Sequence, residues 1–242
     1  MASTDLAVDL TTTTSNGASP ASAAAADDPG RLSEHPAQAD VPGRSPNVRW
    51  QGSRMTRARR WEALGRAGAT VWFTGLPGAG KSTVAAAVEE RLIAAGHPAF
   101  LLDGDNLRHG LNGDLGFDED GRCENVRRTA HVARLLAESG TIALVSLVSP
   151  YARDREAAAQ LHAADNLPFV EVFVSAPLER CEERDPKGLY ARARAGELPG
   201  LTGVGAPYEA PVSPDLVLRT CAESVEGEVQ RVVDALTRQE LI

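Results

Sequence analysis

Residues 69–84, ATVWFTGLPGAGKSTV, constrain this chain more than any other stretch. A β-branched and aromatic run comes first, a glycine-rich loop follows, and the residues from Thr83 onward favour a helix. The loop matches the phosphate-binding pattern G-x-x-x-x-G-K-[ST] at every fixed position, in the strand–loop–helix context that the pattern requires. A glycine turn that only capped a helix would not need the Lys-Ser pair. The sequence therefore predicts a nucleotide phosphate site.

The residue types of this loop each have a physical role. Glycines allow backbone N–H groups to surround phosphates, and the following helix adds the positive end of its dipole. Lys81 would reach the β- and γ-phosphates, and Ser82 would give an oxygen to Mg²⁺. The predicted nucleotide-phosphate-binding residues are Gly75, Leu76, Pro77, Gly78, Ala79, Gly80, Lys81, Ser82 and Thr83.

Composition and charge exclude several classes of protein. With 43% hydrophobic and 24% charged residues and a net charge of −8, the chain is globular, and its acidity argues against nucleic-acid binding. No run approaches the ~20 apolar residues that span a bilayer, and the N-terminus fits neither a secretory signal nor a transit peptide. Three scattered cysteines, Cys123, Cys181 and Cys221, are expected to be reduced thiols of a cytoplasmic protein.

The chain divides into two parts of different composition. Residues 1–46 are rich in Ala, Ser, Thr, Pro and Asp, so we expect a disordered tail. Residues 47–242 form the predicted domain. It opens with an arginine-rich stretch over 47–66 that contains two tryptophans, which we interpret as an arm and short helix packed on the domain. A solvated helix face explains these arginines better than nucleic-acid binding does.

Beyond residue 68, apolar β-type runs alternate with helical ones. We expect strands over 70–74, 99–103, 141–148, 169–175 and 216–219, and helices over 82–95, 123–139, 153–164, 178–184 and 224–238. This pattern predicts an α/β fold of the P-loop NTPase type, with a parallel sheet of about five strands flanked by helices. Ligands bind such sheets outside the carboxyl ends of the strands.

A loop-rich segment over 185–214 interrupts the alternation. KGLYARARAG within it is compatible with a short helix. We expect a lid over about 185–211, the alternative being an inert surface insertion.

Two acids follow the second expected strand, in LLDGDNLR. Asp103 and Asp105 would face the same side of an extended chain. Phosphoryl transfer needs one acid to hold hydrated Mg²⁺ and one to orient or deprotonate the attacking hydroxyl. The third expected strand ends without the acid of a motor ATPase, and no NKxD-like guanine-reading motif occurs. A small-molecule kinase is favoured over a GTP switch.

Other candidate residues lie in the loops and at helix starts. Ser149 would accept a phosphoryl group, position a substrate or merely end the third strand, and Phe117 would stack on a base or pack in its loop. Arg122, Asn125 and the pair Arg127–Arg128 open the next helix, where one arginine of the pair is expected to be only a solvated side chain.

Lysine usage singles out one further residue. Of 25 cationic residues only Lys81 and Lys187 are lysines. Since the phosphate loop uses its lysine as a compact point charge, we infer that Lys187 also works at the site, from the lid.

With these residues in view, the chain resembles the adenylyl-sulfate kinase (APS kinase) family over about residues 47–240. The matching motifs are TVWFTGLPGAGKST, LLDGDNLRHGLNGDLGF, GRCENVRR, SPYARDR, RDPKGLYARARAG and LTGVGAPYEAP. The resemblance implies transfer of a phosphoryl group from ATP, with Mg²⁺, to the 3′-hydroxyl of adenosine 5′-phosphosulfate (APS). The product would be 3′-phosphoadenosine 5′-phosphosulfate, used in sulfate assimilation. It also suggests a homodimer, and a separate ATP sulfurylase is a conceivable partner.

The resemblance also implies roles for individual residues. Asp103 would serve the metal together with Ser82, and Asp105 the substrate hydroxyl. Ser149 matches a serine that the family labels as a phosphoserine intermediate, although direct in-line transfer needs no covalent step. The substrate-binding residues would be Asp105, Arg108, Phe117, Arg122, Asn125, Lys187 and Leu201.

Three positions depart from the family pattern. Gly113 stands where Lys is usual and Gly121 where Asp is usual. Leu201 replaces a Phe that resembles the second aromatic of an adenine clamp, a loss of about 1 kcal/mol or roughly five-fold in affinity. We therefore expect weaker substrate binding with activity retained.

Two alternatives stay open from the sequence. One is a kinase of the same fold that acts on another nucleoside or alcohol. The other is a non-catalytic nucleotide-binding subunit, against which the intact Lys81, Asp103 and Asp105 argue.

Overall fold

The computed structural model describes residues 51–242. The tail expected over 1–46 and the start of the domain at 47–50 lie outside the described residues. Within 51–242, no helix has both the length and the apolar character needed to cross a membrane.

A five-stranded parallel sheet forms the centre of the molecule, in the order β2-β3-β1-β4-β5. Every residue of the middle strand β1 is buried, as expected for a strand covered on both faces. The strands are β1 (Ala69–Thr74), β2 (Ala99–Asp103), β3 (Ile142–Ser146), β4 (Phe169–Ser175) and β5 (Leu216–Arg219). The predicted parallel α/β sheet is confirmed.

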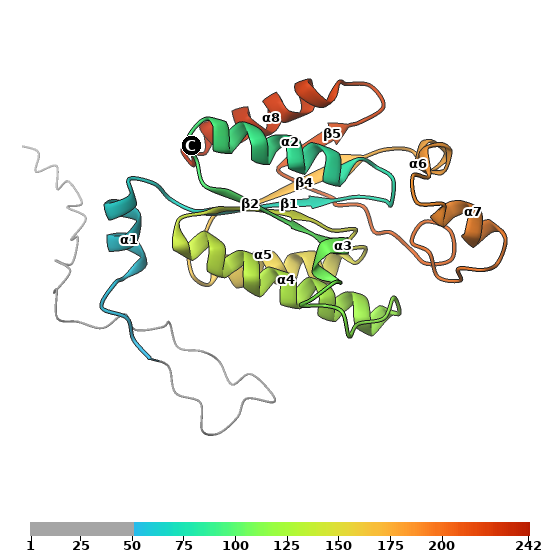
Figure 1. Cartoon of the computed structure of the whole chain (residues 1–242), viewed down its shortest axis with the longest axis horizontal. Helices are drawn as coiled ribbons and strands as arrows, with labels where there is room; N and C mark the ends of the chain where they lie inside the picture. The colour runs from blue at the N-terminus through green and yellow to red at the C-terminus, as the bar shows by residue number, and fades with distance from the viewer. Residues whose placement is uncertain (1–50) are drawn as a thin grey trace, which may run out of the picture.

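Helices cover both faces of the sheet (Figure 1). On one face lie α2 (Lys81–Ala94) and α8 (Val225–Arg238), and on the other lie α4 (Glu119–Ser139) and α5 (Ala152–Ala163). Each face has its own cluster of buried apolar side chains. The site is therefore built on a rigid three-layer frame.

Shorter helices lie at the ends of this frame. The helix expected in the arginine-rich stretch is α1 (Arg57–Leu64), and Trp61 fixes it to α4 by donating from Nε1 to the Glu138 carbonyl at 3.2 Å. At the carboxyl edge of the sheet lie α3 (Gly104–Leu107), α6 (Leu178–Arg184) and α7 (Leu189–Arg194). The last two project to one side in Figure 1.

Two expected boundaries are wrong by more than one residue. β3 ends at Ser146 instead of residue 148. The reason is that Thr74 Oγ1 donates a hydrogen bond to the Val148 carbonyl at 2.8 Å, and Ser149 turns the chain with a φ of 39°. α4 begins at Glu119 instead of residue 123, because the Asp118 side chain caps it, accepting from the Gly121 N–H at 3.0 Å.

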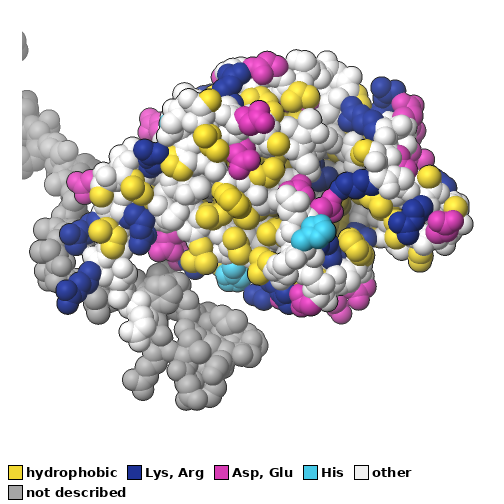
Figure 2. Space-filling model, in the orientation of Figure 1, with side chains coloured by type: hydrophobic (Ala, Val, Ile, Leu, Met, Phe, Trp, Pro, Cys, Tyr) yellow, Lys and Arg dark blue, Asp and Glu magenta, His cyan; other side chains and the backbone are white. Residues whose placement is uncertain are grey.

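Within residues 51–242, β2 is an outer strand of the sheet and pairs with β3 alone. Large apolar side chains are exposed on β2 and on the helices beside it: Ile93 at 56%, Phe100 at 54% and Leu135 at 57%. Figure 2 shows hydrophobic side chains in the region where Figure 1 places β2 between α2 and α4.

Candidate active site

A cleft of about 910 Å³ opens at the carboxyl edge of the sheet. It brings together residues from the phosphate loop, the second strand, the start of α4 and the expected lid. Among the predicted site residues, those that line it are Pro77, Gly78, Gly80, Lys81, Ser82, Thr83, Asp103, Asp105, Arg108, Phe117, Arg122, Asn125, Ser149, Lys187 and Leu201. Gly75, Leu76 and Ala79 complete the phosphate loop without lining the cleft.

The phosphate loop runs from β1 into α2. Gly80 is the N-cap of α2 with a φ of 103°, a backbone conformation that side chains with a Cβ rarely adopt. The turn at Gly80 places the free N–H groups of the first turn of α2 at the cleft. The loop thus offers donors to an anion.

Lys81 spans the loop from the first turn of α2. Its Nζ donates to the carbonyls of Gly75 at 2.9 Å and Leu76 at 2.8 Å. Burial lowers the pKa of Lys81 to about 8. The side chain is therefore a buried cation at neutral pH, held by neutral carbonyls that a phosphate would outcompete.

Three oxygen-bearing side chains meet beside the loop. Ser82 Oγ donates to Asp103 Oδ2 at 2.6 Å and lies 3.1 Å from Ser146 Oγ. Such oxygens suit Mg²⁺, which usually takes one or two carboxylates and completes its shell with water and substrate phosphates. Residues 51–242 contain no cluster of three or more His, Cys, Asp or Glu side chains that could hold a metal ion.

The two acids of DGDN are not both in extended chain, contrary to the sequence expectation. Asp103 ends β2 and caps α3, its Oδ1 accepting from the Asp105 N–H at 3.0 Å, and Asp105 lies in α3. Both nevertheless line the cleft. The Asp105 carboxylate is exposed and forms an ion pair with Lys187 from the lid.

Arginines and one aromatic ring lie on the α4 side of the cleft. The Arg108 guanidinium is centred 4.1 Å from the Phe117 ring centroid, and this ring is 66% exposed. Arg122 donates to the Phe117 carbonyl and to the Gly200 carbonyl, both at 2.7 Å. Arg122 therefore joins the loop before α4 to the end of the lid.

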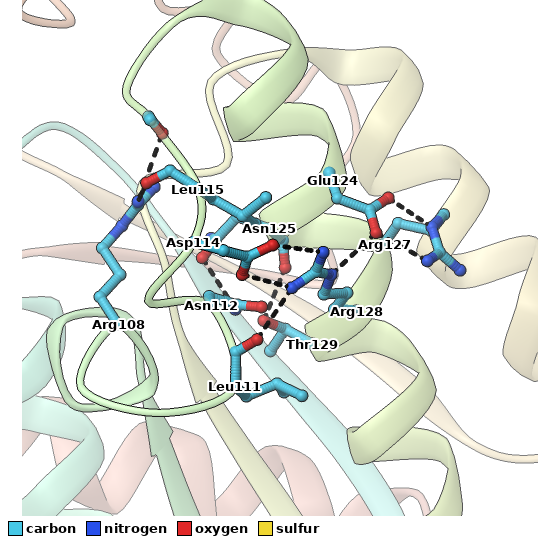
Figure 3. A network of polar contacts seen from close by, with 11 residues as sticks. Arg108, Leu111, Asn112, Asp114, Leu115, Glu124, Asn125, Arg127, Arg128 and Thr129 are labelled. Atoms are coloured by element: carbon cyan, nitrogen blue, oxygen red, sulfur yellow. Dashed lines mark hydrogen bonds and ion pairs between the residues drawn. The ribbon is translucent and has the colours of Figure 1, made fainter.

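On the α4 side of the cleft, a network of polar contacts orients Asn125 (Figure 3). The buried Asn112 donates from Nδ2 to Asn125 Oδ1 at 2.9 Å. Because Oδ1 of Asn125 is engaged, its Nδ2 is left as a donor for the cleft that Asn125 lines.

The two arginines that follow differ, as the sequence predicts. Arg128 forms a bidentate pair with Asp114, at 2.7 and 2.9 Å, and donates to the Leu111 carbonyl, which fastens the loop before α4 to the helix (Figure 3). Arg127 is 60% exposed and pairs with Glu124. Arg127 is the solvated one.

Ser149 is buried at the base of the cleft. Trp72 donates from Nε1 to Ser149 Oγ at 3.1 Å, and Arg155 donates to the Ser149 carbonyl at 2.8 Å. These contacts make Ser149 part of a fixed frame around the cleft.

The three departures from the family pattern have different surroundings. Leu201 is 7% exposed and belongs to the apolar core while also lining the cleft. A Cβ at Gly121 would lie 2.6 Å from the Gly116 carbonyl oxygen, so no larger residue fits there without movement of the loop. At Gly113 the nearest atom, the Arg108 carbonyl oxygen, would be 3.1 Å away.

Sequence reasoning missed the α8 side of the cleft, formed by Arg184, Thr220, Glu223 and Glu228. Thr220 Oγ1 donates to the Ala79 carbonyl of the phosphate loop at 2.8 Å, and Arg184 donates to the Thr220 carbonyl at 2.7 Å. Thr220 directly follows β5, so a search after the fifth strand as well as the second and third would have found it. Ser146, at the end of β3, was missed as well.

Comparisons with known proteins agree with this geometry. The family model described as adenylylsulphate kinase matches residues 67–219. The adenylyl-sulfate kinase of Clostridium acetobutylicum is 44% identical over 199 residues, which cover 82% of this chain and 98% of the relative. That of Clostridium kluyveri is 46% identical over 194 residues, covering 80% and 96%.

A solved structure resembles both the sequence and the fold. It is that of the Mycobacterium tuberculosis APS kinase CysC in complex with AMPPNP and APS, with 52% identity and a TM-score of 0.70. The match covers 71% of this chain and 99% of that one. The chain therefore belongs to the adenylylsulphate kinase family, enzymes that transfer a phosphoryl group from ATP to adenosine 5′-phosphosulfate.

Proposed function

We propose that the two sides of the cleft hold the two substrates, with ATP on the α8 side and APS on the α4 side of the phosphate loop. The observation that carries this assignment is that Lys81 and Asp105 line one cleft, while Ser82, next to Lys81, donates to Asp103 at 2.6 Å. The γ-phosphoryl group would pass from the loop to a hydroxyl beside Asp105, giving 3′-phosphoadenosine 5′-phosphosulfate.

On the ATP side, the N–H groups of the loop and the Lys81 ammonium would bind the phosphates. Ser82 and Asp103 would hold Mg²⁺. Mg²⁺, when bound, neutralises charge on the transferred group. Thr220 and Arg184 both donate to the Ala79 carbonyl of the phosphate loop from the α8 side, at 2.8 and 3.4 Å, which supports a site for the base of ATP on that side.

On the APS side, Asp105 would orient the 3′-hydroxyl and accept its proton. Arg108, Arg122 and the Nδ2 of Asn125 are donors for the phosphosulfate group, and the exposed Phe117 ring offers a surface for adenine. Burial lowers the pKa of Arg108, and the positive charge of Arg122 lowers it further. A bound anion would relieve this repulsion, which supports a phosphosulfate site.

The test is ADP release, coupled to a spectrophotometric assay, with Mg²⁺ and ATP in the presence of APS or of adenosine 5′-monophosphate. We expect the parent to turn over with APS as the acceptor and not with the monophosphate. Lys81→Ala should have no turnover, and the turnover of Asp105→Ala should fall sharply. Arg127→Ala, on the exposed face of α4, is the control and should behave as the parent. Turnover with the monophosphate would mean that APS is not the specific acceptor. ATP binding without turnover on either acceptor would reject the proposed kinase activity.

The division of the chain is also a proposal. We propose that residues 47–242 are the catalytic domain, with a lid over about 185–211, and that residues 1–46 are dispensable for transfer. The contact of the lid with the loop, in which the Tyr190 hydroxyl donates to the Pro77 carbonyl at 2.9 Å, supports the first point. A chain shortened to residues 47–242 should retain kcat and KM, and a loss of turnover would contradict the boundary.

We further propose a homodimer that acts in the cytoplasm. The open edge of β2 and the exposed Phe100 beside it offer a self-complementary surface. The free thiols of Cys123, Cys181 and Cys221 suit a reducing compartment. Sedimentation should give a dimer for the parent and a monomer for Phe100→Lys, and a monomeric parent would reject the dimer. The same measurement with an added ATP sulfurylase would test for that partner.

A further inference from the structure

One buried acid of the cleft has no role in the transfer described above. Glu228 lies in the first turn of α8, is 1% exposed and lines the cleft. Its Oε1 is buried and has no hydrogen-bond partner. The nearby Glu223, by contrast, pairs with Arg231 at 2.8 Å.

An unpartnered buried carboxyl group destabilises a folded chain, and most buried polar groups are hydrogen-bonded for that reason. Burial raises the pKa of Glu228 above its ordinary value, and the charge of Glu223 raises it further, while Arg184 and Arg231 oppose the rise. A neutral carboxyl group carries one donor and one acceptor side by side. Because Glu228 is 1% exposed and its Oε1 lacks a partner, its neutral form is favoured, and in that form it presents the same donor–acceptor pair as a Gln amide.

The surroundings of Glu228 show which part of a ligand it would meet. Glu228, Thr220 and Arg184 line the same side of the cleft, and this side adjoins the phosphate loop. A Cβ at Gly80 would lie 3.4 Å from Thr220 Cγ2 and 3.9 Å from Arg184 Nη1. A nucleotide whose phosphates occupy the loop and whose base extends to this side brings that base to Glu228. This step rests on the proposed placement of ATP.

We propose that Glu228 recognises the base of the phosphoryl donor and selects ATP over GTP. Its carboxyl group accepts a hydrogen bond from the exocyclic N6 amino group of adenine and donates one to the ring nitrogen N7. An amide side chain pairs with adenine through the same two positions. Guanine presents two acceptors at this edge, O6 and N7, so one carboxyl oxygen would face an acceptor whichever oxygen carries the proton.

The experiment compares four proteins: the parent, Glu228→Leu, Glu228→Gln and Glu226→Gln. Leu removes both hydrogen-bonding atoms at similar volume, and Gln keeps a donor and an acceptor. Glu226 lies on the same turn but is 73% exposed and pairs with Arg91, so its variant is the matched control. Calorimetry gives the affinities for the non-hydrolysable analogues of ATP and GTP, and steady-state kinetics gives kcat/KM for ATP and GTP.

We expect Glu228→Leu to reduce the preference for ATP over GTP by about ten-fold or more, the loss typical of an unmatched buried hydrogen bond. Glu228→Gln should keep the preference within about three-fold of the parent, and Glu226→Gln should leave it unchanged. An unchanged preference in Glu228→Leu, or an equal loss in the Gln and Leu variants, would overturn the proposal. A parent that binds neither analogue would instead reject the proposed ATP site.

Discussion

Lys187, in the loop-rich segment between α6 and α7, forms an ion pair with Asp105 in α3. Both side chains are more than half exposed, at 59% and 61%, so the pair contributes little to folding, and we interpret it as a contact that positions the expected lid. We predict that Lys187→Ala lowers kcat/KM for APS about ten-fold, the effect of losing one charge-assisted contact, without changing the unfolding temperature. Arg180→Ala removes an equally exposed pair, with Glu183 on α6, and should change neither quantity. Equal activities of the two variants would contradict a role for the lid lysine.

The lowered pKa of Lys81 makes nucleotide binding depend on pH. Since burial lowers this pKa to about 8, the loop loses its cation as the pH rises through 8, and the affinity for a non-hydrolysable ATP analogue should fall between pH 7 and 9. Lys81→Arg, which stays charged over this range, is the control and should show a weaker but pH-independent affinity. Calorimetry at three pH values checks both, and a flat profile for the parent would contradict the shift.

The same shift has an opposite consequence for stability. The unfolded chain keeps its proton on Lys81 to higher pH than the folded chain, because the folded pKa is the lower one. The contribution of Lys81 to the free energy of unfolding therefore rises as the pH increases from about 8 toward 10.5. Lys81→Met lacks the titrating group and should not show this rise. Denaturant titrations of both proteins across that range measure the difference.

The elements of the fold were largely predictable because strand and helix patterns are local. The apolar β-type runs and the alternation with helices predicted all five strands, and the phosphate-loop pattern predicted the loop that joins β1 to α2. The errors came where tertiary contacts decide the boundary. The end of β3 depends on Thr74 reaching the Val148 carbonyl, and no local pattern contains that contact.

The site was predictable where residues directly follow a strand within a recognisable motif. The conformation of Asp105 was not, because a capping contact from Asp103 turns the chain into α3. The α8 side was missed because Thr220 and Glu228 belong to no motif and become neighbours of the phosphate loop only when β5 joins the sheet. The part played by Asn112 likewise depends on a contact across 13 residues.

Asn112 sets which atom of Asn125 faces the cleft. In Asn112→Asp, an ionised carboxylate can only accept, so Asn125 would turn its Nδ2 toward residue 112 and present Oδ1 to an anionic substrate. We predict that KM for APS rises about ten-fold, while KM for ATP stays unchanged. Arg127→Ala on the exposed face of the same helix is the control. A parallel rise in both KM values would indicate a general loss of structure instead.

Leu201 stands where the family pattern has a phenylalanine, so restoring an aromatic ring there tests whether the ring contributes to substrate binding. It borders the cleft and retains 7% exposure, so a larger side chain has an open direction in which to project. Leu201→Phe should tighten APS binding by roughly five-fold, from about 1 kcal/mol of stacking. Leu201→Met, of similar size to Leu and without a ring, should leave the affinity unchanged. Calorimetry with APS measures both, and equal affinities would remove Leu201 from the substrate site.

Ser149 distinguishes a positioning residue from a covalent one. Its backbone has a φ of 39° and its hydroxyl accepts from the buried Trp72 indole. Ser149→Ala and Ser149→Gly both leave that N–H unpaired, but glycine adopts a positive φ without strain, so the Gly variant should be the more stable of the two by about 1 kcal/mol. Denaturant unfolding of both variants gives the difference.

Because in-line transfer needs no phosphoenzyme, both Ser149 variants should also keep kcat within about ten-fold of the parent. The parent should carry no radiolabel after incubation with γ-labelled ATP and denaturation. Loss of turnover in both variants, with folding retained and label on Ser149 of the parent, would establish the covalent route. If both variants retain turnover and the Gly variant is the more stable, the serine hydroxyl has a positioning role. Its hydrogen bond from Trp72 then serves to fix the turn after β3.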